Sequence, residues 1–229
     1  VTVRLLDAPL HEFLEENEEQ NPMLGLRGIR LAITTEDLYR TQTRALIAAV
    51  QERISMGGDP KVEIMVPLVS LEEELTLVLG WIRQELNNSP IPVPVGTMIE
   101  TPRAALIAGT LAKHIDFISF GTNDLTQMTF GFSRDDVEVS VINEYIEKEL
   151  LEKSPFETLD IDGVGLLVTT AISQSRKVNP DIKIGICGEH GGDPASIRFL
   201  VDAGVDYVSC SPPRIPVARL ISSQILLDS

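Results

Sequence analysis

The chain alternates between short apolar runs and longer segments whose apolar residues recur at helical spacing. The strand candidates are residues 1–6, 21–28, 63–69, 93–100, 115–121, 183–187 and 206–210, of which 21–28 also fits a turn. Helical patterns occupy residues 34–55, 71–86, 101–114, 163–177, 194–204 and the C-terminal end, while residues 122–160 are less regular. Because the strand candidates are apolar throughout, the pattern predicts an α/β fold in which helices cover a parallel sheet.

Local signals predict where several helices begin and end. Thr34 with Asp37 resembles a capping box, in which a threonine side chain binds the first free amides of a helix. Thr101 followed by Pro102 is typical of a helix N-terminus. Gly204 predicts the end of the helix that precedes it, because glycine adopts the left-handed conformation without a steric penalty.

The seven strand candidates bear directly on the architecture. A TIM-type (β/α)8 barrel needs eight strands, one more than the chain offers. The alternative is an open doubly wound sheet, which usually carries a glycine-rich turn after its first strand. No such turn follows residues 1–6. At 229 residues the chain is long enough for a barrel, and we expect one domain over residues 1–229.

Composition argues against several classes of protein. A net charge of −15 makes the chain a poor candidate for binding nucleic acid phosphates. It lacks an apolar run of about 18 residues, so no membrane span is expected. The N-terminus has no signal-peptide layout and no initiator Met, which predicts a fragment or a processed product. Cys187 and Cys210 offer no disulfide framework or zinc spacing, as expected in a reducing compartment.

Polar residues at the ends of the strand candidates are the candidate functional groups. In a parallel barrel the catalytic side chains lie where strands end and the following loops begin. The residues at these positions are Arg4, Asp7, Arg27, Glu100, Asn123, Asp124, Cys187, Glu189, His190, Ser209 and Ser211. They span the whole chain, and the architecture would bring them to one face.

The chemistry of this set is specific. Glu100 and Asp124 are hard oxygen ligands of the kind that suits Mg²⁺. Arg4 and Arg27 suit the planar binding of carboxylate or phosphate oxygens. Cys187, next to glycine, can donate a proton or act as a nucleophile. Together they predict a small phosphorylated or carboxylated substrate that reacts through an enolate.

Each residue taken singly favours a structural role. A carboxylate at a strand end often caps the next helix, and an isolated arginine usually forms a surface or structural ion pair. Cysteine is among the most buried residue types, so Cys187 and Cys210 fit a core position. His11 and His190 are each compatible with structural histidines. The functional interpretation rests on the number of such residues at the ends of different strands.

Four long segments carry a resemblance to a known family: NPMLGLRGIRL (21–31), GTMIETPRAALIA (96–108), FISFGTNDLTQMTFGFSRDD (117–136), and IGICGEHGGDP with YVSCSP (184–194, 207–212). They resemble the C-terminal domain of the phosphoenolpyruvate-utilising enzymes. MTFGFSRDD and GEHGGDP resemble the pyruvate, phosphate dikinase branch, and less so phosphoenolpyruvate synthase or enzyme I of the sugar phosphotransferase system. The resemblance runs almost from end to end.

The resemblance implies an eight-stranded barrel that binds pyruvate or phosphoenolpyruvate with Mg²⁺. It makes Glu100 and Asp124 the metal ligands and Cys187 the acid/base that moves a proton at C3. The substrate-binding residues that it implies are Arg4, Arg27, Ser119, Thr122, Asn123 and Gly185. Arg103 belongs to a shared motif, but no chemical role is assigned to it. The family also implies a homodimer in the cytoplasm, or in the plastid stroma for a plant protein.

The chain departs from the family in two ways. No nucleotide-grasp domain and no phosphohistidine motif are present in this sequence, so we expect the phosphohistidine on another domain or a partner chain. The family's first barrel strand should precede residue 1, which predicts a barrel without its first β/α unit. The expected function is the pyruvate/phosphoenolpyruvate half-site of a dikinase. A non-catalytic remnant or dimerisation module, and an enzyme I-type phosphotransferase domain, remain alternatives.

Overall fold

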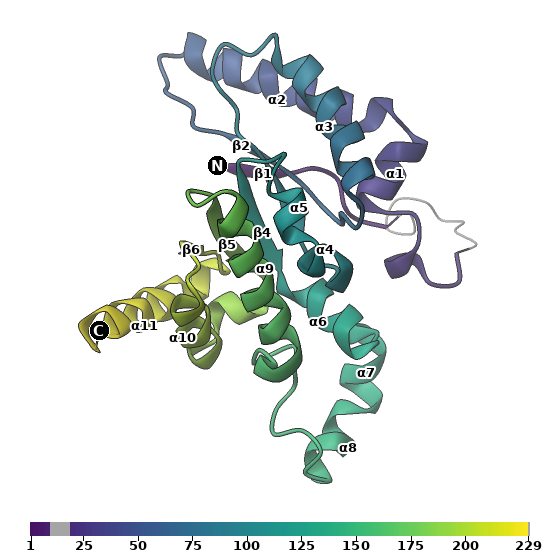
Figure 1. Cartoon of the computed structure of the whole chain (residues 1–229), viewed down its shortest axis with the longest axis vertical. Coiled ribbons are helices and arrows are strands. Elements are labelled where there is room, and N and C mark those ends of the chain that lie inside the picture. Colours follow the sequence, from purple (N-terminus) through teal and green to yellow (C-terminus); the bar gives the residue numbers. More distant parts are fainter. Residues whose placement is uncertain (10–18, 229) are drawn as a thin grey trace. The chain divides into compact units, whose positions relative to one another are not determined.

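The computed structural model describes residues 1–9 and 19–228. They form two compact units, which Figure 1 traces in colours that follow the sequence. The first unit comprises Val1–Met98 and His114–Phe117, and the second comprises Ile99–Lys113 and Ile118–Ser229. Each unit has its own buried apolar residues.

The described residues contain six β-strands, which are β1 (Thr2–Arg4), β2 (Glu63–Val66), β3 (Val95–Ile99), β4 (Phe117–Gly121), β5 (Lys183–Cys187) and β6 (Tyr207–Val208). In the first unit β2 lies between β1 and β3 and is parallel to both. In the second unit β5 lies between β4 and β6 and is parallel to β6. The α/β class with parallel strands is therefore confirmed. The closed barrel without its first unit stays a prediction.

The prediction of seven strands is wrong, because residues 21–28 do not form one. A short 3₁₀ helix, Pro22–Leu24, occupies this segment, and Gly28 begins helix α1 (Gly28–Thr34). Proline at the first helical position fixes the backbone angle that such a turn requires. The expected strand at 206–210 is also shorter than predicted, since β6 is Tyr207–Val208.

The remaining helices connect the strands. They are α2 (Asp37–Ser55), α3 (Glu72–Leu86), α4 (Pro102–Leu106), α5 (Ala108–Leu111), α6 (Thr122–Phe130), α7 (Arg134–Ser140), α8 (Ile142–Glu147), α9 (Leu166–Val178), α10 (Pro194–Ala203) and α11 (Ile215–Asp228), with a π-helical turn at Ile161–Gly165 and 3₁₀ turns at Glu189–Gly192 and Pro212–Arg214. None of the helices in the described ranges combines the length and the apolar content needed to cross a membrane.

The predicted helix ends are correct in two cases and wrong in one. The Ala104 amide donates to Thr101 Oγ1 at 3.1 Å, so Thr101 caps α4. Gly204 ends α10 with a φ of 93°, in the left-handed region. The capping box at Thr34 is absent because Thr34 is the last residue of α1, where its hydroxyl donates to the Leu31 carbonyl at 2.9 Å.

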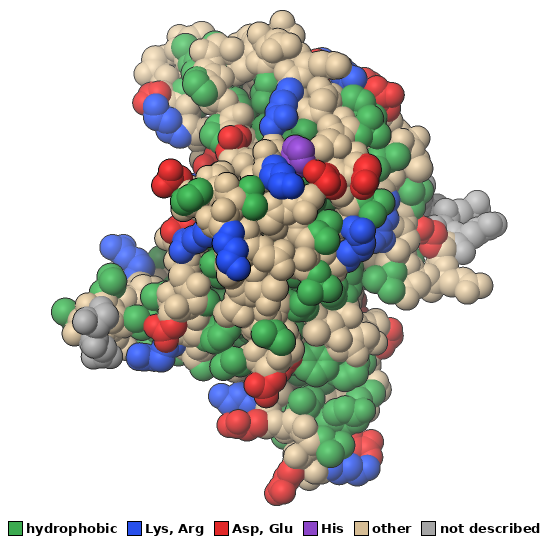
Figure 2. Space-filling view, in the orientation of Figure 1, with side chains coloured by type: hydrophobic (Ala, Val, Ile, Leu, Met, Phe, Trp, Pro, Cys, Tyr) green, Lys and Arg blue, Asp and Glu red, His purple; other side chains and the backbone are tan. Residues whose placement is uncertain are grey.

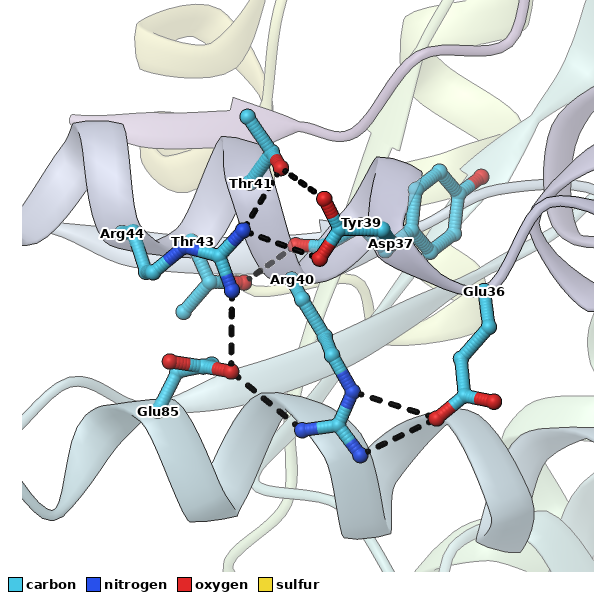
Figure 3. Close-up of polar contacts among 8 residues, drawn as sticks. All are labelled: Glu36, Asp37, Tyr39, Arg40, Thr41, Thr43, Arg44 and Glu85. Carbon is cyan, nitrogen blue, oxygen red and sulfur yellow. Dashed lines mark hydrogen bonds and ion pairs between the residues drawn. The ribbon is translucent and has the colours of Figure 1, made fainter.

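The first unit is built on buried apolar side chains and a surface network of charges. Ile64 and Val66 on β2 are fully buried, as is Tyr39 on α2. The Tyr39 hydroxyl donates to the Leu6 carbonyl at 2.9 Å, which ties α2 to the end of β1. Figure 3 shows the network that joins α2 to α3, in which Arg40 and Arg44 both bind the Glu85 carboxylate.

The second unit has a buried interior and an apolar outer segment. β4 is buried along its whole length, and Ile184 and Ile186 of β5 are fully buried. A strand buried on both faces explains the continuous apolar run that the sequence shows there. Figure 2 shows apolar side chains gathered on the surface of the α7–α8 segment, where Val139 and Tyr145 are exposed.

Candidate functional site

In the first unit, both predicted substrate-binding arginines bind one carboxylate, that of Asp7. Arg27 is buried, and its Nη2 lies 2.6 Å from Asp7 Oδ2. Its Nε donates to the Asp7 backbone carbonyl at 3.1 Å and lies 3.3 Å from Oδ1. Arg4 Nη1 reaches the same Oδ2 at 3.0 Å from a more exposed position. Two positive groups are therefore held side by side, which is a suitable arrangement for binding a polyanion.

The backbone around this arginine cluster has an unusual conformation. Gly28 has a φ of +56°, and a Cβ there would lie 2.9 Å from Asp7 Oδ1 and 2.8 Å from Leu68 Cβ. Leu68 itself has a φ of 59° and is fully buried just beyond β2. A non-glycine residue in the left-handed region costs on the order of 1–3 kcal/mol and persists only where the surroundings impose it. Asp7 therefore lies in a tightly constrained pocket of the first unit.

In the second unit, the two predicted metal ligands lie close together. Glu100 directly follows β3 and is 1% exposed, while Asp124 lies in the first turn of α6. One carboxylate oxygen of each lies within 4.8 Å of the other. Thr101 caps α4 by its hydroxyl, so Glu100 is not needed as the cap of that helix. Two hard oxygen donors at this separation fit a divalent cation such as Mg²⁺.

Cys187 is the last residue of β5 and is half-buried. Its Sγ lies 3.5 Å from the Phe120 carbonyl oxygen at the end of the neighbouring β4. The chain turns immediately afterwards at Gly188, whose φ of 113° is essentially restricted to glycine. A Cβ at Gly188 would lie 2.7 Å from Thr122 Oγ1, so glycine also permits a close approach to α6. The thiol is therefore held at a strand end and is not an ordinary core residue.

Thr122 and Asn123, the first residues of α6, bind the segment that carries Cys187. The Thr122 hydroxyl lies 3.2 Å from the Cys187 carbonyl oxygen. Asn123 Oδ1 accepts a hydrogen bond from the Glu189 amide at 3.2 Å. Both residues were predicted to bind substrate, and both contact the cysteine loop.

His190 is fully buried in the turn after Cys187, and both of its ring nitrogens have partners. Nδ1 lies 2.7 Å from Thr122 Oγ1, and Nε2 lies 2.9 Å from the Pro155 carbonyl oxygen. Burial lowers the pKa of His190 below its ordinary value, more than the Pro155 hydrogen bond raises it. These contacts fit a structural role for His190, which is one of the roles that the sequence predicts.

The other predicted substrate-binding residues of the second unit lie on strands. Ser119 is buried in the middle of β4. Gly185 pairs with Tyr207 across the sheet, and a Cβ there would lie 2.0 Å from the tyrosine ring. The Tyr207 ring therefore explains why glycine occupies position 185, and the substrate-binding role of Gly185 stays a prediction. Cys210 packs against a cluster of Ile197, Ala218 and Ile225, as expected of an apolar contact.

A cavity of about 510 Å³ opens in the second unit next to this loop. Glu189 and Asp193 line it on one side, together with Arg134 and Arg214. Cys187 is not among the lining residues, so this cavity does not hold the thiol.

Sequence reasoning noted Asp7 only as a strand-end residue and assigned it no role. The available signal was its spacing of three residues from Arg4 across the end of β1, which predicts an ion pair. Pairing with Arg27, twenty positions further along the chain, has no sequence signal. His11 lies outside the described residues. Arg103 lies on α4, and no role is assigned to it.

Comparison with known proteins identifies the family. A family model for the phosphoenolpyruvate-binding domain of the phosphoenolpyruvate-utilising enzymes matches residues 1–227. The chain belongs to this family. The resemblance seen in the sequence motifs is thereby confirmed, as is the position of the match over nearly the whole chain.

Two proteins similar to this chain are pyruvate, phosphate dikinases. Pyruvate, phosphate dikinase 2 of Zea mays is 46% identical over 260 residues, which cover 99% of this chain and 29% of that protein. Pyruvate, phosphate dikinase of Rhizobium meliloti (strain 1021) is also 46% identical, over 100% of this chain and 29% of that protein. The chain thus spans less than a third of the length of these relatives. Since 260 aligned positions exceed 229 residues, the relatives also carry residues that this chain lacks.

A solved structure shows the same fold at low sequence identity. A citrate lyase from Burkholderia xenovorans LB400 matches with a TM-score of 0.52 and 16% identity, covering 80% of this chain and 53% of that chain. At this identity the likeness concerns the fold alone, and it agrees with the α/β class.

Proposed function

We propose that the chain is the pyruvate/phosphoenolpyruvate half-site of a pyruvate, phosphate dikinase-type phosphotransferase. The observation that carries the proposal is that the arginines, the carboxylates and the cysteine expected by motif occur together in this chain. The arginines are paired, the carboxylates are close together, and the thiol is half-buried at a strand end.

Glu100 and Asp124 would hold Mg²⁺ through their carboxylate oxygens. When bound, the cation would act as a Lewis acid towards the oxygens of the three-carbon substrate. The buried position of Glu100 keeps the surrounding dielectric low, which strengthens the attraction between its carboxylate and a cation.

Arg4 and Arg27 would bind the substrate's carboxylate or phosphoryl oxygens. Asp7 holds the two guanidinium groups next to each other, and the exposed side of Arg4 leaves it accessible to an anion. Ser119, Thr122, Asn123 and Gly185 complete the proposed substrate-binding set.

Cys187 would exchange a proton with C3 of the substrate. Towards phosphoenolpyruvate, its thiolate takes a proton from the methyl carbon of pyruvate, and the electron pair of that bond forms the enolate. The enolate oxygen then attacks the phosphorus atom of a phosphohistidine, and the bond between phosphorus and the histidine nitrogen breaks. In the reverse direction the thiol returns the proton to C3.

The phosphohistidine would be supplied by another domain of the same protein or by a partner chain. The share of the relatives that this chain spans supports this part of the proposal. Assembly as a homodimer is part of the same proposal. So is a cytoplasmic or plastid location, since plant relatives carry the word chloroplastic in their names.

The test is a calorimetric titration with oxalate, a planar mimic of the enolate, with and without Mg²⁺. We expect wild-type chain to bind oxalate only when Mg²⁺ is present. Glu100→Gln should weaken this binding by about tenfold or more, because it removes one charged ligand of the cation. The matched control is Glu144→Gln, which removes an exposed carboxylate paired with Lys148.

Two results would contradict the proposal. Folded wild-type chain that binds no oxalate in either condition would remove the half-site. Unchanged affinity in Glu100→Gln, with a similar result for Asp124→Asn, would remove both carboxylates from the metal site.

A further inference from the structure

A continuous chain of short polar contacts links Pro155, His190, Thr122 and Cys187 in the second unit. The Pro155 carbonyl lies 2.9 Å from His190 Nε2, and His190 Nδ1 lies 2.7 Å from Thr122 Oγ1. Thr122 Oγ1 lies in turn 3.2 Å from the Cys187 carbonyl oxygen. His190 and Thr122 are both fully buried. The chain therefore ends on the peptide group of the proposed acid/base.

The partners determine where the hydrogens lie. A carbonyl oxygen only accepts, so the Pro155 contact places a hydrogen on His190 Nε2. In the neutral ring Nδ1 then has a lone pair, and the Thr122 hydroxyl donates to it. The 2.7 Å contact with Nδ1 is shorter than the 3.2 Å contact with the Cys187 carbonyl, so the ring nitrogen is the stronger partner. His190 thus determines the direction of the Thr122 hydroxyl. Because a hydroxyl carries one hydrogen, the 3.2 Å approach of Thr122 Oγ1 to the Cys187 carbonyl is then a contact without a hydrogen bond.

Thr122 also contacts the loop sterically. A Cβ at Gly188 would lie 2.7 Å from Thr122 Oγ1 and 3.0 Å from Asn123 Oδ1, so the loop lies directly against the start of α6. Asn123 adds a hydrogen bond from the Glu189 amide. The space between this turn and the start of α6 is therefore too small for a side chain at position 188.

We propose that His190 is a positioning residue for Cys187, acting through the turn that joins the two residues. The inference rests on the proposed function, in which Cys187 is the acid/base. His190 lies in the turn that directly follows Cys187, and both of its ring nitrogens are held, one by the Thr122 hydroxyl at the start of α6 and one by the Pro155 carbonyl. The thiol is thereby kept at a constant place relative to C3 of the substrate. A displacement of about 1 Å can reduce a rate by about 100-fold, so this contact should affect turnover more than binding.

Two pairs of variants isolate the contact. Thr122→Val replaces the hydroxyl by a methyl group of similar size, while Thr122→Ser keeps the hydroxyl. His190→Asn places an amide near the position of Nδ1 and so keeps a group that faces Thr122. His190→Gln places its amide near the position of Nε2 and so keeps the donor to the Pro155 carbonyl. A purely structural role would make the two histidine variants equivalent, because each keeps one of two hydrogen bonds.

Two readouts are needed, both in a Cys210→Ala background so that Cys187 is the only thiol. The first is the rate at which iodoacetamide alkylates Cys187, which reports the position of the thiol without requiring turnover. The second is the exchange of the C3 protons of pyruvate with solvent deuterium in the presence of Mg²⁺, from which kcat and KM are obtained. Cys187→Ala is the zero point of both measurements.

We expect Thr122→Val to raise the alkylation rate about fivefold or more and to lower kcat about tenfold or more. Thr122→Ser should return both readouts most of the way to their wild-type values. His190→Gln should change both readouts as Thr122→Val does, with KM within about twofold of wild type, and His190→Asn should lie closer to wild type. Thr43→Val, which removes a buried hydroxyl bond to the Tyr39 carbonyl in the first unit, is the control and should change neither readout.

The two hypotheses fail in different ways. If wild-type chain exchanges no C3 protons, the proposed function fails for this chain, and the alkylation rates still decide the positioning role. If folded Thr122→Val matches wild type in alkylation, or if His190→Gln and His190→Asn are equal in both readouts, the positioning role is overturned. A rise in KM without a fall in kcat in His190→Gln would also overturn it, because His190 would then affect substrate binding and not the position of the thiol.

Discussion

Two groups of arginines and carboxylates in the first unit use the same chemistry in opposite surroundings. In the Asp7 cluster, the Arg27 and Asp7 side chains are 4% and 3% exposed. In the α2–α3 network, Arg44 and Asp37 form a similar contact at 2.9 Å with side chains that are 47% and 75% exposed. Figure 3 shows that Arg40 adds further ion pairs to this network, since it binds both Glu36 and Glu85.

The comparison indicates that burial, and not the number of ion pairs, determines how much folding free energy is lost when a residue of the group is replaced. Exposed pairs contribute about 0–1 kcal/mol because water and salt screen them. A buried charge left without its partner costs several kcal/mol, since it has already lost its hydration. The constrained backbone at Gly28 and Leu68 lies beside the buried cluster, which is consistent with a site that is held in place at some cost.

The largest effect is expected from Arg27→Met. Among the residues that the structure describes, it leaves the buried Asp7 carboxylate with the more exposed Arg4 as its charged partner. The free energy of unfolding should fall by about 3–5 kcal/mol. Urea unfolding followed by circular dichroism measures this change.

The control is Arg30→Met on the neighbouring helix α1, where an exposed guanidinium donates to the Leu24 carbonyl. If Arg27→Met does not fold, the double variant Arg27→Met with Asp7→Asn should recover part of the stability, because no buried charge of this pair then remains. A loss no larger than that of Arg30→Met would show that the Asp7 cluster contributes little despite its burial.

A smaller effect is expected from Arg4→Ala. Arg4 binds the same Asp7 oxygen as Arg27, but its side chain is 46% exposed. Solvent screening should limit the loss of stability to about 1 kcal/mol or less. The same urea measurement tests this, and a loss equal to that of Arg27→Met would mean that burial is not what separates the two arginines. Binding of oxalate with Mg²⁺ should still weaken, since Arg4 is the accessible anion ligand in the proposed function.

The smallest effect is expected from Arg44→Ala in the exposed network. The hydrogen bond from Arg44, followed by that from Thr41, lowers the pKa of Asp37 below its ordinary value of 3.8. The ionised Asp37 therefore favours folding above about pH 3.8, and this contribution is lost as the pH falls through and below that value. In Arg44→Ala the pH dependence in this range should flatten, because the ionised Asp37 then contributes less to folding, and the stability at pH 7 should fall only slightly.

Salt supplies the control for that prediction. At about 0.5 M NaCl the wild-type chain and Arg44→Ala should have the same acid unfolding curve, because exposed charges are screened over a few ångströms. A difference that persists in salt would mean that the α2–α3 network is not screened as its exposure implies.

Much of the fold could be predicted from the apolar pattern. Strands β2 to β5 fall inside predicted runs, because a strand buried on both faces needs continuous apolar residues. Residues 21–28 were misread because Met23, Leu24 and Leu26 are apolar without forming a ladder, and Pro22 favours a helical turn. The capping prediction at Thr34 is wrong because the residues after Thr34 fit a helix start, whereas Thr34 itself is the last residue of the preceding helix α1.

The candidate site was predictable in its residue types and less so in its contacts. Glu100 and Asp124 follow buried strands, and their proximity agrees with the prediction from strand ends. Thr122 and His190 were harder, because a threonine and a histidine 68 positions apart carry no pairwise signal. Sequence alone does not separate a core cysteine from a functional one. The half-buried position of Cys187 at the end of β5 favours the functional interpretation.

The α/β class, several helix ends and the family to which the chain belongs could be predicted from the amino-acid sequence alone. These follow from local preferences and from motifs, which are written in consecutive residues. The folded structure was needed to show that Arg4 and Arg27 both bind Asp7. The same holds for the close approach of the Tyr207 ring to Gly185 and for the contact between His190 and Thr122. Such contacts join residues far apart in the chain, and their strength depends on burial, which is a property of the folded molecule and not of any segment.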